Sequence, residues 1–311
     1  CKGFLEFPKN RLKPEDLPKI RESSMILLYR ILFILNAEAK KLLPLSDKPD
    51  DNEYWSISLE SLKGEIAKES LGRNGNGRKV LPTLATHWQH LRTLFEFINE
   101  GSEAHGVPKE SIHVTSYNGG LFDPEKPENK FLEEYMISNI YLDQAVDFIC
   151  RSPDDNGKLV PVDYGTLSIR HLGSIYEGLL EYRVVPATEP MAVVEGSDSY
   201  VPLEKAIDGG KTNIQEFKVG DPILLTDKGE RKATGSYYTP DYIVKYIVKN
   251  TVGPLVDTKR TEWEKSEGKG PLWSPMLDIK VLDPAMGSGH FLVEAVNFLA
   301  EEVVTAWLHD N

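Results

Sequence analysis

The residues best suited to chemistry in this 311-residue chain lie in one short run near its C-terminal end. Asp283 supplies a carboxylate, and Gly287 and Gly289 stand on either side of Ser288, where a backbone without Cβ atoms can turn sharply against a ligand. A helix that begins after this turn would offer free N–H groups to an anion, while Asp283 would attract a cation. A ligand that carries both an ammonium and a carboxylate group suits that pairing.

The apolar pattern on both sides predicts the elements that position this run. Ile279–Leu282 is typical of a buried strand, Asp283–Gly289 of a turn and His290–Leu308 of an amphipathic helix. A parallel strand would present Asp283 at the carboxyl edge of a sheet, where ligands of open α/β folds bind.

A second helix start is predicted upstream, at Thr239-Pro240. Thr239 is suited to cap free N–H groups, and Pro240 is suited to the first helical position. The helix would continue to about Thr251.

Two nucleotide-binding patterns fit the chain less well. The dinucleotide fingerprint needs a third glycine where this sequence has Leu292. The phosphate-binding loop needs a glycine five residues before Gly210-Lys211-Thr212, and Lys205 stands there.

The full sequences of two segments, taken together, resemble the motifs of a known family. Leu282–Leu292, with the sequence LDPAMGSGHFL, closely resembles the S-adenosylmethionine-binding motif of amino-group DNA methyltransferases. Gly235–Pro240, with the sequence GSYYTP, resembles the second cofactor motif of that family, which precedes the first in enzymes that methylate the exocyclic amine of adenine. Arg231–Gly235 and Leu172–Glu181 resemble the large single-chain adenine methyltransferases of type IIG restriction–modification and phage-exclusion systems.

This resemblance implies a site, a fold and partners. The implied fold is a mainly α-helical N-terminal region followed by the start of an α/β Rossmann-like methyltransferase domain that depends on S-adenosylmethionine. The implied cofactor-binding residues are Tyr238, Thr239, Pro240, Asp283, Ala285, Met286, Gly287 and Gly289. The implied partners are S-adenosylmethionine and double-stranded DNA, to which the family adds restriction or phage-defence subunits.

The family's catalytic element, Asn/Asp-Pro-Pro-Tyr/Phe, does not occur in this sequence. Asp123-Pro124, Asp221-Pro222 and Asp283-Pro284 are each followed by a residue other than proline. We therefore predict no catalytic residue in this chain. We expect it to be the front part of a longer polypeptide and to transfer no methyl group by itself.

The chain divides into three regions by pattern. Residues 1–183 form a predicted helical connector, with apolar residues at helical spacing in Ile20–Leu42, Leu81–Ile98 and Leu167–Leu180, and a loop at Gly72–Gly77. Residues 184–227 form a predicted strand-bearing linker. Its short β-prone pieces are Val184-Val185, Met191–Val194 and Pro222–Leu225. Residues 228–311 form the N-terminal part of the methyltransferase domain, with only its cofactor motifs.

Composition limits the class of protein. The chain has 36 Lys+Arg and 48 Asp+Glu, a net charge of −12, and only two cysteines. It has no apolar stretch of the length of a membrane span, so we expect a soluble protein of the prokaryotic cytoplasm. Lys228–Arg260 carries seven basic and three acidic residues, and this local excess suits a solvated helix face as well as a phosphate-facing patch.

No metal site is predicted. Glu128-Asn129-Lys130 and Glu267-Gly268-Lys269 have the spacing of a nuclease motif but lie in predicted loops, and His87 and His90 lack further ligands at zinc spacing. Three alternatives stay open: a bifunctional enzyme with a nuclease outside this chain, a non-catalytic helical interaction module, and a methyltransferase that acts on RNA or protein.

Overall fold

The computed structural model describes residues 1–46, 53–76, 81–108, 112–117, 119–154, 157–167, 182–194, 200–209, 214–226, 239–266, 270–287 and 289–310, together with residues 171, 173, 175, 178 and 179. The chain forms two compact units. The first comprises Cys1–Leu167 and Tyr182–Thr226, and the second comprises Ser168–Glu181 and Asp227–Asn311.

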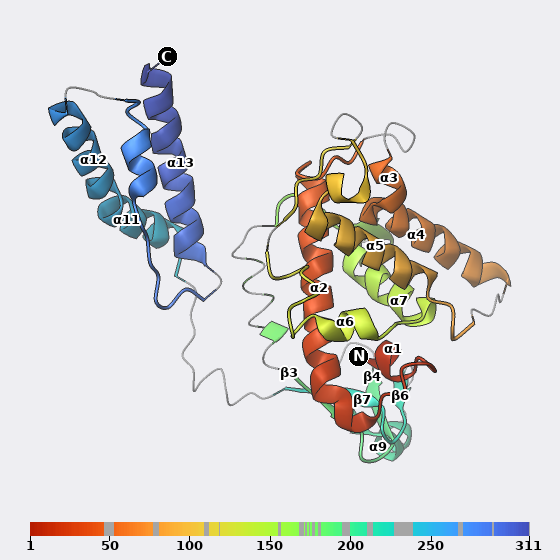
Figure 1. Cartoon of the computed structure of the whole chain (residues 1–311). Helices are drawn as coiled ribbons and strands as arrows, with labels where there is room; N and C mark the ends of the chain where they lie inside the picture. The colour runs from red at the N-terminus through yellow and green to blue at the C-terminus, as the bar shows by residue number, and fades with distance from the viewer. Residues whose placement is uncertain are drawn as a thin grey trace. The chain divides into compact units, whose positions relative to one another are not determined.

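The first unit is a helical bundle with short strands attached (Figure 1). Its helices are α1 (Lys2–Leu5), η1 (Pro14–Asp16), α2 (Leu17–Ala39), α3 (Tyr54–Ile57), α4 (Leu59–Asn76), α5 (Thr86–Glu100), η2 (Glu103–His105), α6 (Lys130–Glu134), α7 (Asn139–Cys150) and α9 (Leu203–Asp208). The long helix α2 contacts α4 and α6, and α4, α5 and α7 contact one another. The predicted mainly helical N-terminal region is therefore confirmed.

The core of this bundle forms where apolar side chains recur at helical spacing. Ile20, Ile31 and Ile34 of α2 are almost completely buried, as are Trp88 and Leu91 of α5. Burial of each such side chain stabilises the fold by about 1.5–3 kcal/mol relative to leaving it in water. The helix predicted over Ile20–Leu42 is confirmed as α2.

The helix predicted over Leu81–Ile98 starts later than expected, at Thr86. Leu81 and Leu84 lie in a turn before α5 and are exposed. The Leu84 carbonyl accepts a hydrogen bond from the backbone N–H of Asn139 at 2.7 Å, which holds this segment outside the helix.

The helix α4 corrects a second expectation, because it runs through most of the predicted Gly72–Gly77 loop and ends at Asn76. The first half of this helix is anchored by Leu59, Leu62 and Ile66, which are fully buried. Once that half is packed, each further residue adds a backbone hydrogen bond at low cost, even where glycine is a poor helix former.

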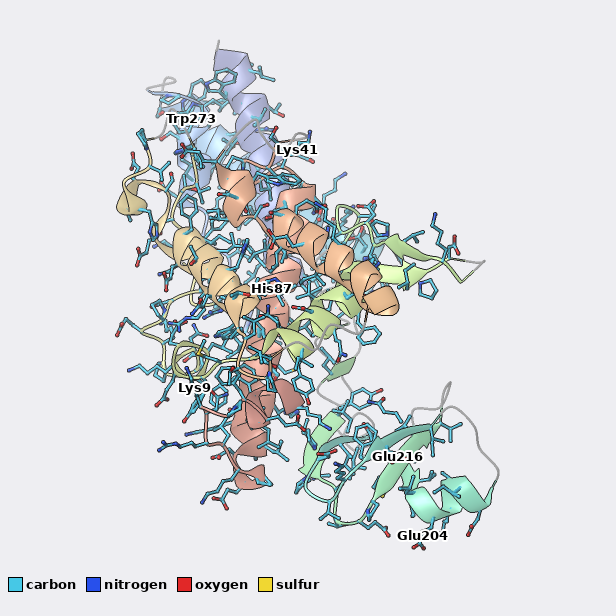
Figure 2. The ribbon with its side chains drawn as sticks, turned by 90° about the vertical axis from the view of Figure 1, so that its right-hand side faces the viewer. Lys9, Lys41, His87, Glu204, Glu216 and Trp273 are labelled. Atoms are coloured by element: carbon cyan, nitrogen blue, oxygen red, sulfur yellow. The ribbon has the colours of Figure 1, made fainter. Side chains whose placement is uncertain are left out.

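Small antiparallel sheets complete the first unit. The strands are β1 (Arg151–Pro153), β2 (Leu159–Pro161), β3 (Tyr182–Pro186), β4 (Met191–Val194), β5 (Tyr200–Pro202), β6 (Ile214–Phe217) and β7 (Pro222–Thr226). Strand β1 pairs with β2, β3 pairs with β7, and β4 lies between β5 and β6. Figure 2 shows the last of these sheets with Glu216 on β6 and Glu204 on α9. The predicted strands at Val184-Val185, Met191–Val194 and Pro222–Leu225 are confirmed.

An ion pair connects the strands to the helices. The Lys2 Nζ atom lies 2.9 Å from Asp221 Oδ2 and 3.5 Å from Glu6 Oε1. The contact with Asp221 raises the pKa of Lys2 against the opposing effect of its partial burial, and Lys2 in turn helps to lower the pKa of Asp221.

The second unit contains α11 (Asp241–Thr251), α12 (Gly253–Lys265), η3 (Ser274–Asp278) and α13 (His290–Asp310). Helix α11 packs against α12 and α13 (Figure 1). Its core is a row of valines at four-residue spacing that meets small side chains of α13. The buried members are Val244, Val248, Val252, Val256, Met276, Ala295 and Ala306. The predicted helix from His290 is confirmed as α13.

The strand predicted at Ile279–Leu282 is wrong. These residues form no strand, and Val281 and Leu282 are 41% and 87% exposed. A strand needs a neighbour for its N–H and C=O groups, and no described residue of the second unit belongs to a strand. The sheet edge expected to present Asp283 is therefore not formed by the residues described.

The helix start at Thr239-Pro240 differs by one residue from the prediction. Pro240 is the N-cap, Asp241 is the first helical residue, and no side chain caps the helix. The Pro240 carbonyl accepts hydrogen bonds from the N–H groups of Ile243 and Val244, which makes Pro240 the residue from which the helix begins. No helix in the described parts of the chain combines the length and apolar character that a membrane crossing requires.

Candidate cofactor-binding site

The glycine turn, residues 283–289, is closed by two hydrogen bonds within itself. Asp283 Oδ1 accepts the N–H of Ala285 at 2.9 Å, and the N–H of Gly289 donates to the carbonyl of Met286 at 2.8 Å. The N–H of Val293 then donates to the Gly289 carbonyl and starts α13. The predicted turn at Asp283–Gly289 is confirmed.

Two glycines of this turn have backbone angles that other residues rarely adopt. Gly287 has a φ of +55° and Gly289 a φ of +81°. A Cβ atom at either position would meet no atom nearer than 3.9 Å. Glycine is required there by the left-handed backbone, since the space beside it is open.

Three of the five predicted cofactor residues in the turn are exposed. Ala285, Met286 and Gly287 are exposed, Asp283 is half-buried and Gly289 is buried. The start of α13 follows directly, and the first N–H groups of a helix have no preceding turn to accept their hydrogen bonds. Anion-binding groups and a carboxylate therefore lie within one short, accessible segment.

The upstream motif lies partly outside the described residues. Tyr238, together with Gly235–Tyr237, Arg231–Thr234 and most of Leu172–Glu181, falls in undescribed parts of the chain. Thr239 and Pro240 are half-buried and lead into α11. No hydrogen bond or ion pair among the described residues joins Thr239 or Pro240 to Asp283.

The two motifs are nevertheless connected by their following residues. Asp241 directly follows Pro240, and His290 directly follows Gly289; His290 Nε2 lies 3.3 Å from Asp241 Oδ1. The other carboxylate oxygen of Asp241 lies 3.0 Å from Lys245 Nζ. Hydrogen bonds from Lys245 and from His290 lower the pKa of Asp241, and Asp241 raises the pKa of Lys245.

Sequence reasoning missed Asp241 and His290. The signal that could have found them is their position, since each is the first residue of a helix. Asp241 directly follows the GSYYTP motif, and His290 lies inside the LDPAMGSGHFL motif, directly after its last glycine. His290 Nδ1 is buried and has no hydrogen-bond partner among the described residues.

These features fit an amino-acid-like ligand such as the methionine part of S-adenosylmethionine. The turn is accessible at residues 285–287, and its two left-handed glycines carry no Cβ atom. The buried His290 Nδ1 has no hydrogen-bond partner among the described residues. Asp283 is the carboxylate of the segment available to a cation.

Other polar clusters have structural partners. His87 Nδ1 lies 2.6 Å from Asp143 Oδ1 in the buried interior of the first unit, where Figure 2 labels His87. His90 Nε2 contacts the carbonyls of Ile57 and Ser58 at 3.0 and 3.1 Å. His87 is therefore buried and His90 half-buried, and both have structural partners. Across the described residues, no group of three or more His, Cys, Asp or Glu side chains is placed to hold a metal ion.

The predicted nuclease-like spacings do not form a site in the described chain. Asn129, inside Glu128-Asn129-Lys130, is buried and donates to the carbonyls of Gly120 and Asp123, so this segment is a structural turn. Glu267–Lys269 lies outside the described residues.

The basic segment is largely neutralised where it is described. Lys245 pairs with Asp241, Lys259 with Glu262 and Arg260 with Glu302. Lys228, Arg231 and Lys232 lie outside the described residues. The described part of this segment therefore supports a solvated helix face over a surface for phosphates.

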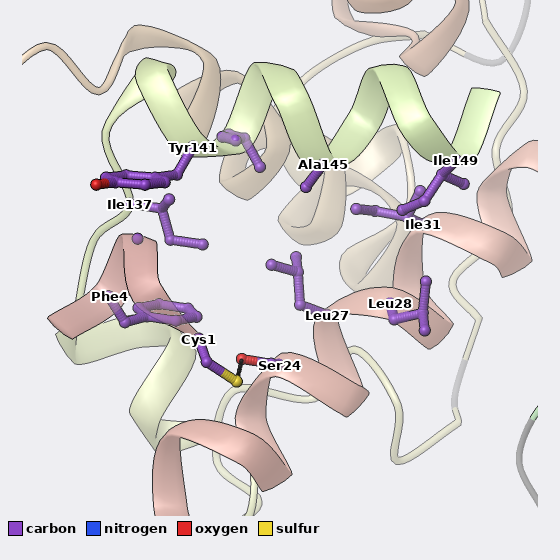
Figure 3. Close-up of a pocket in the computed structure, with 12 residues that line it drawn as sticks. Cys1, Phe4, Ser24, Leu27, Leu28, Ile31, Ile137, Tyr141, Ala145 and Ile149 are labelled. Atoms are coloured by element: carbon purple, nitrogen blue, oxygen red, sulfur yellow. Dashed lines mark hydrogen bonds between the residues drawn. The ribbon is translucent and has the colours of Figure 1, made fainter. Parts of the chain in front are cut away.

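The described residues of the first unit line pockets of their own, of which two are well formed. One of about 200 Å³ lies between α1, α2 and α7 and is mainly apolar, with Cys1 Sγ and Ser24 Oγ 3.5 Å apart at its edge (Figure 3). The other, of about 160 Å³, lies beside Cys150, whose pKa is raised by burial to about 11. Neither pocket is lined by a residue of the glycine turn or of Thr239-Pro240.

The C-terminal part of the chain is similar to a known protein family. Residues 224–308 match the family model described as N-6 DNA Methylase. This range contains both cofactor motifs, and it confirms the resemblance to amino-group DNA methyltransferases of the restriction–modification kind.

Two curated relatives agree with that match. The putative type II restriction enzyme and methyltransferase RM.MjaORFECS2P of Methanocaldococcus jannaschii is 35% identical over 103 residues, which are 25% of this chain and 9% of the relative. The adenine-specific methyltransferase BrxX of Escherichia coli O9:H4 is 27% identical over 178 residues, which are 51% of this chain and 13% of the relative. This chain thus spans a small part of the length of each relative. No solved structure matches it significantly.

Proposed function

We propose, from the premise that the C-terminal part of this chain belongs to the N-6 DNA methylase family, that it holds S-adenosylmethionine for methyl transfer to adenine in double-stranded DNA. The observation that carries this proposal is the open glycine turn next to Asp283, inside the matched range. Its glycine conformations and the following helix start suit a ligand with both an ammonium and a carboxylate group.

The proposed cofactor-binding residues are those that the resemblance implies. They are Tyr238, Thr239, Pro240, Asp283, Ala285, Met286, Gly287 and Gly289. In this proposal Asp283 and the backbone of the turn hold the methionine end, and Thr239 and Pro240 hold the cofactor from the side of α11. The structure supports this proposal in two ways. The turn is accessible, and His290, which directly follows it, contacts Asp241 on α11.

When it is bound, S-adenosylmethionine supplies a methyl group on a positively charged sulfur, ready for attack by the exocyclic amine of adenine. The residues of this chain bind and orient that group, which lowers the barrier by placing the reacting atoms in line. The base must also leave the DNA stack, and we propose that the residues that receive it lie outside this chain.

The first experiment measures cofactor binding by the longest polypeptide that contains this chain. Asp283→Ala should weaken the binding of S-adenosylmethionine in calorimetry at least tenfold, since a hydrogen bond to a charged group contributes about 1.5–3 kcal/mol. Asp278→Ala is the matched control, because Asp278 is an exposed aspartate of the same unit outside both motifs. Unchanged affinity in a folded Asp283→Ala protein would contradict the proposed site.

The second experiment measures methyl transfer. The same polypeptide should transfer labelled methyl groups to the exocyclic amine of adenine in duplex DNA, and the 311-residue chain by itself should not. Transfer of the labelled methyl group to cytosine, RNA or protein instead of adenine would contradict adenine as the methyl acceptor.

A nuclease in the same polypeptide is a second candidate, favoured by the relative named as both restriction enzyme and methyltransferase. We place it outside this chain, with residues 1–183 as a helical connector, 184–227 as a linker and 228–311 as the beginning of the methyltransferase domain. We also propose a cytoplasmic location in a prokaryote. Cleavage of unmodified DNA in the presence of Mg²⁺ tests the nuclease.

A further inference from the structure

Where it is described, the glycine turn makes few polar contacts with the rest of its unit. The hydrogen bonds from Ala285 to Asp283 and from Gly289 to Met286 lie inside the turn, and the Gly289 carbonyl accepts the N–H of Val293 in α13. Val281 and Leu282 before it are exposed. Among the described residues, no hydrogen bond or ion pair joins residues 280–289 to α11 or α12. We therefore expect a contact that positions the turn among the residues that directly follow it.

His290 is the first residue after the turn that contacts another element. Its side chain is 13% exposed, and its Nε2 atom lies 3.3 Å from Asp241 Oδ1 on α11. A carboxylate can only accept hydrogen bonds, so Nε2 is the donor in this contact. The contact thus joins the last residues of the turn to the first residue of α11.

The acceptor is itself held in place. Asp241 uses one oxygen for His290 and the other for Lys245, which lies one helical turn further along α11 at 3.0 Å. The contact with Lys245 favours the direction of the carboxylate in which its other oxygen faces His290. A carboxylate with a fixed direction positions its partner better than one free to rotate.

The apolar contacts between α11 and α13 act differently. Val244, Val248 and Ala295 are buried where these helices meet, and Phe291, which directly follows His290, packs against the same core. These contacts hold the two helices together, but burial of apolar surface is non-directional and does not orient a polar group. The polar contact acts where Thr239-Pro240 and Gly287–Gly289 end.

We propose that Asp241 and His290 form a latch that positions the glycine turn against the start of α11, so that both cofactor motifs face one bound S-adenosylmethionine. The pair acts through the backbone of the turn, and both are positioning residues. This inference rests on the proposed function for the identity of the ligand, while the latch itself is a property of the protein without ligand.

The test compares hydrogen exchange in the turn with cofactor affinity, in the longest polypeptide that contains this chain. Hydrogen exchange measured by mass spectrometry on peptides spanning residues 283–293 reports the turn without ligand. Calorimetry with S-adenosylhomocysteine, the product form, reports affinity. His290→Ala and Asp241→Ala should each accelerate exchange and weaken binding by about threefold to tenfold, the effect of one ordinary hydrogen bond.

Two conservative variants distinguish loss of the hydrogen bond to Asp241 from loss of side-chain volume at position 290. His290→Gln keeps a donor at the distance of Nε2 and should restore slow exchange. His290→Asn carries its amide only as far as Nδ1 and should resemble His290→Ala. The double variant should be no worse than either single alanine, since both remove the same contact. Lys249→Ala, an exposed position on α11, is the control and should change nothing.

The results separate the two proposals. Wild-type exchange in both alanine variants, or additive effects in the double variant, would overturn the latch. If the unaltered protein binds no S-adenosylhomocysteine, the proposed function fails, and the exchange rates still decide whether the latch exists. Faster exchange with normal affinity would overturn the role of the latch in cofactor binding.

Discussion

The two units of the chain bury their side chains in contrasting ways. The first unit encloses large side chains completely, among them Phe4, Ile34 and Trp88. The second unit buries mostly valine and alanine, and leaves Leu282, Tyr242 and Trp307 87%, 73% and 51% exposed. The first unit also encloses charged groups and provides partners for them. Stability is therefore concentrated in the first unit, while the chemistry implied by the motifs belongs to the second.

This contrast explains why the candidate site is an open turn. A packed interior resists changes of even one methylene group, whereas an exposed turn accepts a ligand without rearranging a core. The same openness means that few contacts fix the turn, and each of them matters more for binding than for stability. The two units should consequently respond to substitution in different ways.

The largest expected effect is at Arg30, a fully buried residue of α2. Its Nε donates to the Leu121 carbonyl at 2.8 Å, and its guanidinium lies 5.0 Å from the centre of the Phe95 ring. Arg30→Ala leaves a cavity and removes the donor, and should lower the free energy of unfolding by about 3–5 kcal/mol in urea titrations. Arg30 and Arg92 both pair with Glu133, at 3.7 and 3.1 Å, but Arg92 is partly exposed, so Arg92→Ala should cost less than about 1 kcal/mol. Similar losses in both variants would contradict the proposed difference.

The next effect is a pH dependence at Glu38. This carboxyl group accepts hydrogen bonds from the N–H groups of Leu59 and Glu60 and from the Tyr54 hydroxyl, and burial raises its pKa to about 7. Because the ordinary value is 4.5, folding takes up a proton between pH 4.5 and 7. The stabilisation is complete below pH 4.5 and is lost as the pH rises through 7, by up to about 3 kcal/mol.

Glu38→Gln removes this titration and is the way to measure it. The free energy of unfolding should fall between pH 4.5 and 7 more steeply in the unaltered chain than in the variant. Equal slopes would show that Glu38 stays ionised in the folded protein, with its three donors outweighing burial.

Two glycines with nearly the same φ angle allow a comparison of the two units. Gly101 and Gly289 have φ angles of +83° and +81°. A Cβ atom at Gly101 would lie 2.8 Å from the backbone N of Ser116, whereas one at Gly289 would meet nothing nearer than 3.9 Å. Gly101→Ala should therefore cost about 2–4 kcal/mol, and Gly289→Ala only about 1 kcal/mol from backbone strain.

Cofactor affinity should reverse that order. Gly289→Ala alters the turn and should weaken the binding of S-adenosylmethionine, while a folded Gly101→Ala protein should bind normally. Thermal unfolding and calorimetry on the same two variants provide both measurements. Equal affinities would remove Gly289 from the proposed site.

How far the sequence predicts the structure depends on how local each feature is. Helices α2, α11 and α13 were predictable because their apolar residues recur at helical spacing along one segment. The glycine turn was predictable from Asp283 and its glycines. The strand predicted at Ile279–Leu282 is wrong, because a strand forms only with a neighbour that its own residues do not specify.

The partners of the buried charged residues could not be predicted from the sequence either. Arg30 finds its acceptor 91 residues away, and Glu38 caps a helix that begins 21 residues later. Nothing in the local pattern distinguishes these residues from surface charges of the same helix. The contact of Asp241 with His290 spans 49 residues and connects two motifs that the sequence presents separately.

The smallest expected effect is at Leu282, and it tests the comparison most directly. Because Leu282 is 87% exposed, Leu282→Ser should change the free energy of unfolding of the 311-residue chain by less than about 0.5 kcal/mol. Leu62→Ala, at a fully buried leucine of the first unit, should cost about 2–5 kcal/mol in the same urea titration. Repeating both substitutions in the longest polypeptide that contains this chain sharpens the comparison. A cost at Leu282 that appears only there would mean that further residues cover it, and equal small costs would mean that the side chain stays in water.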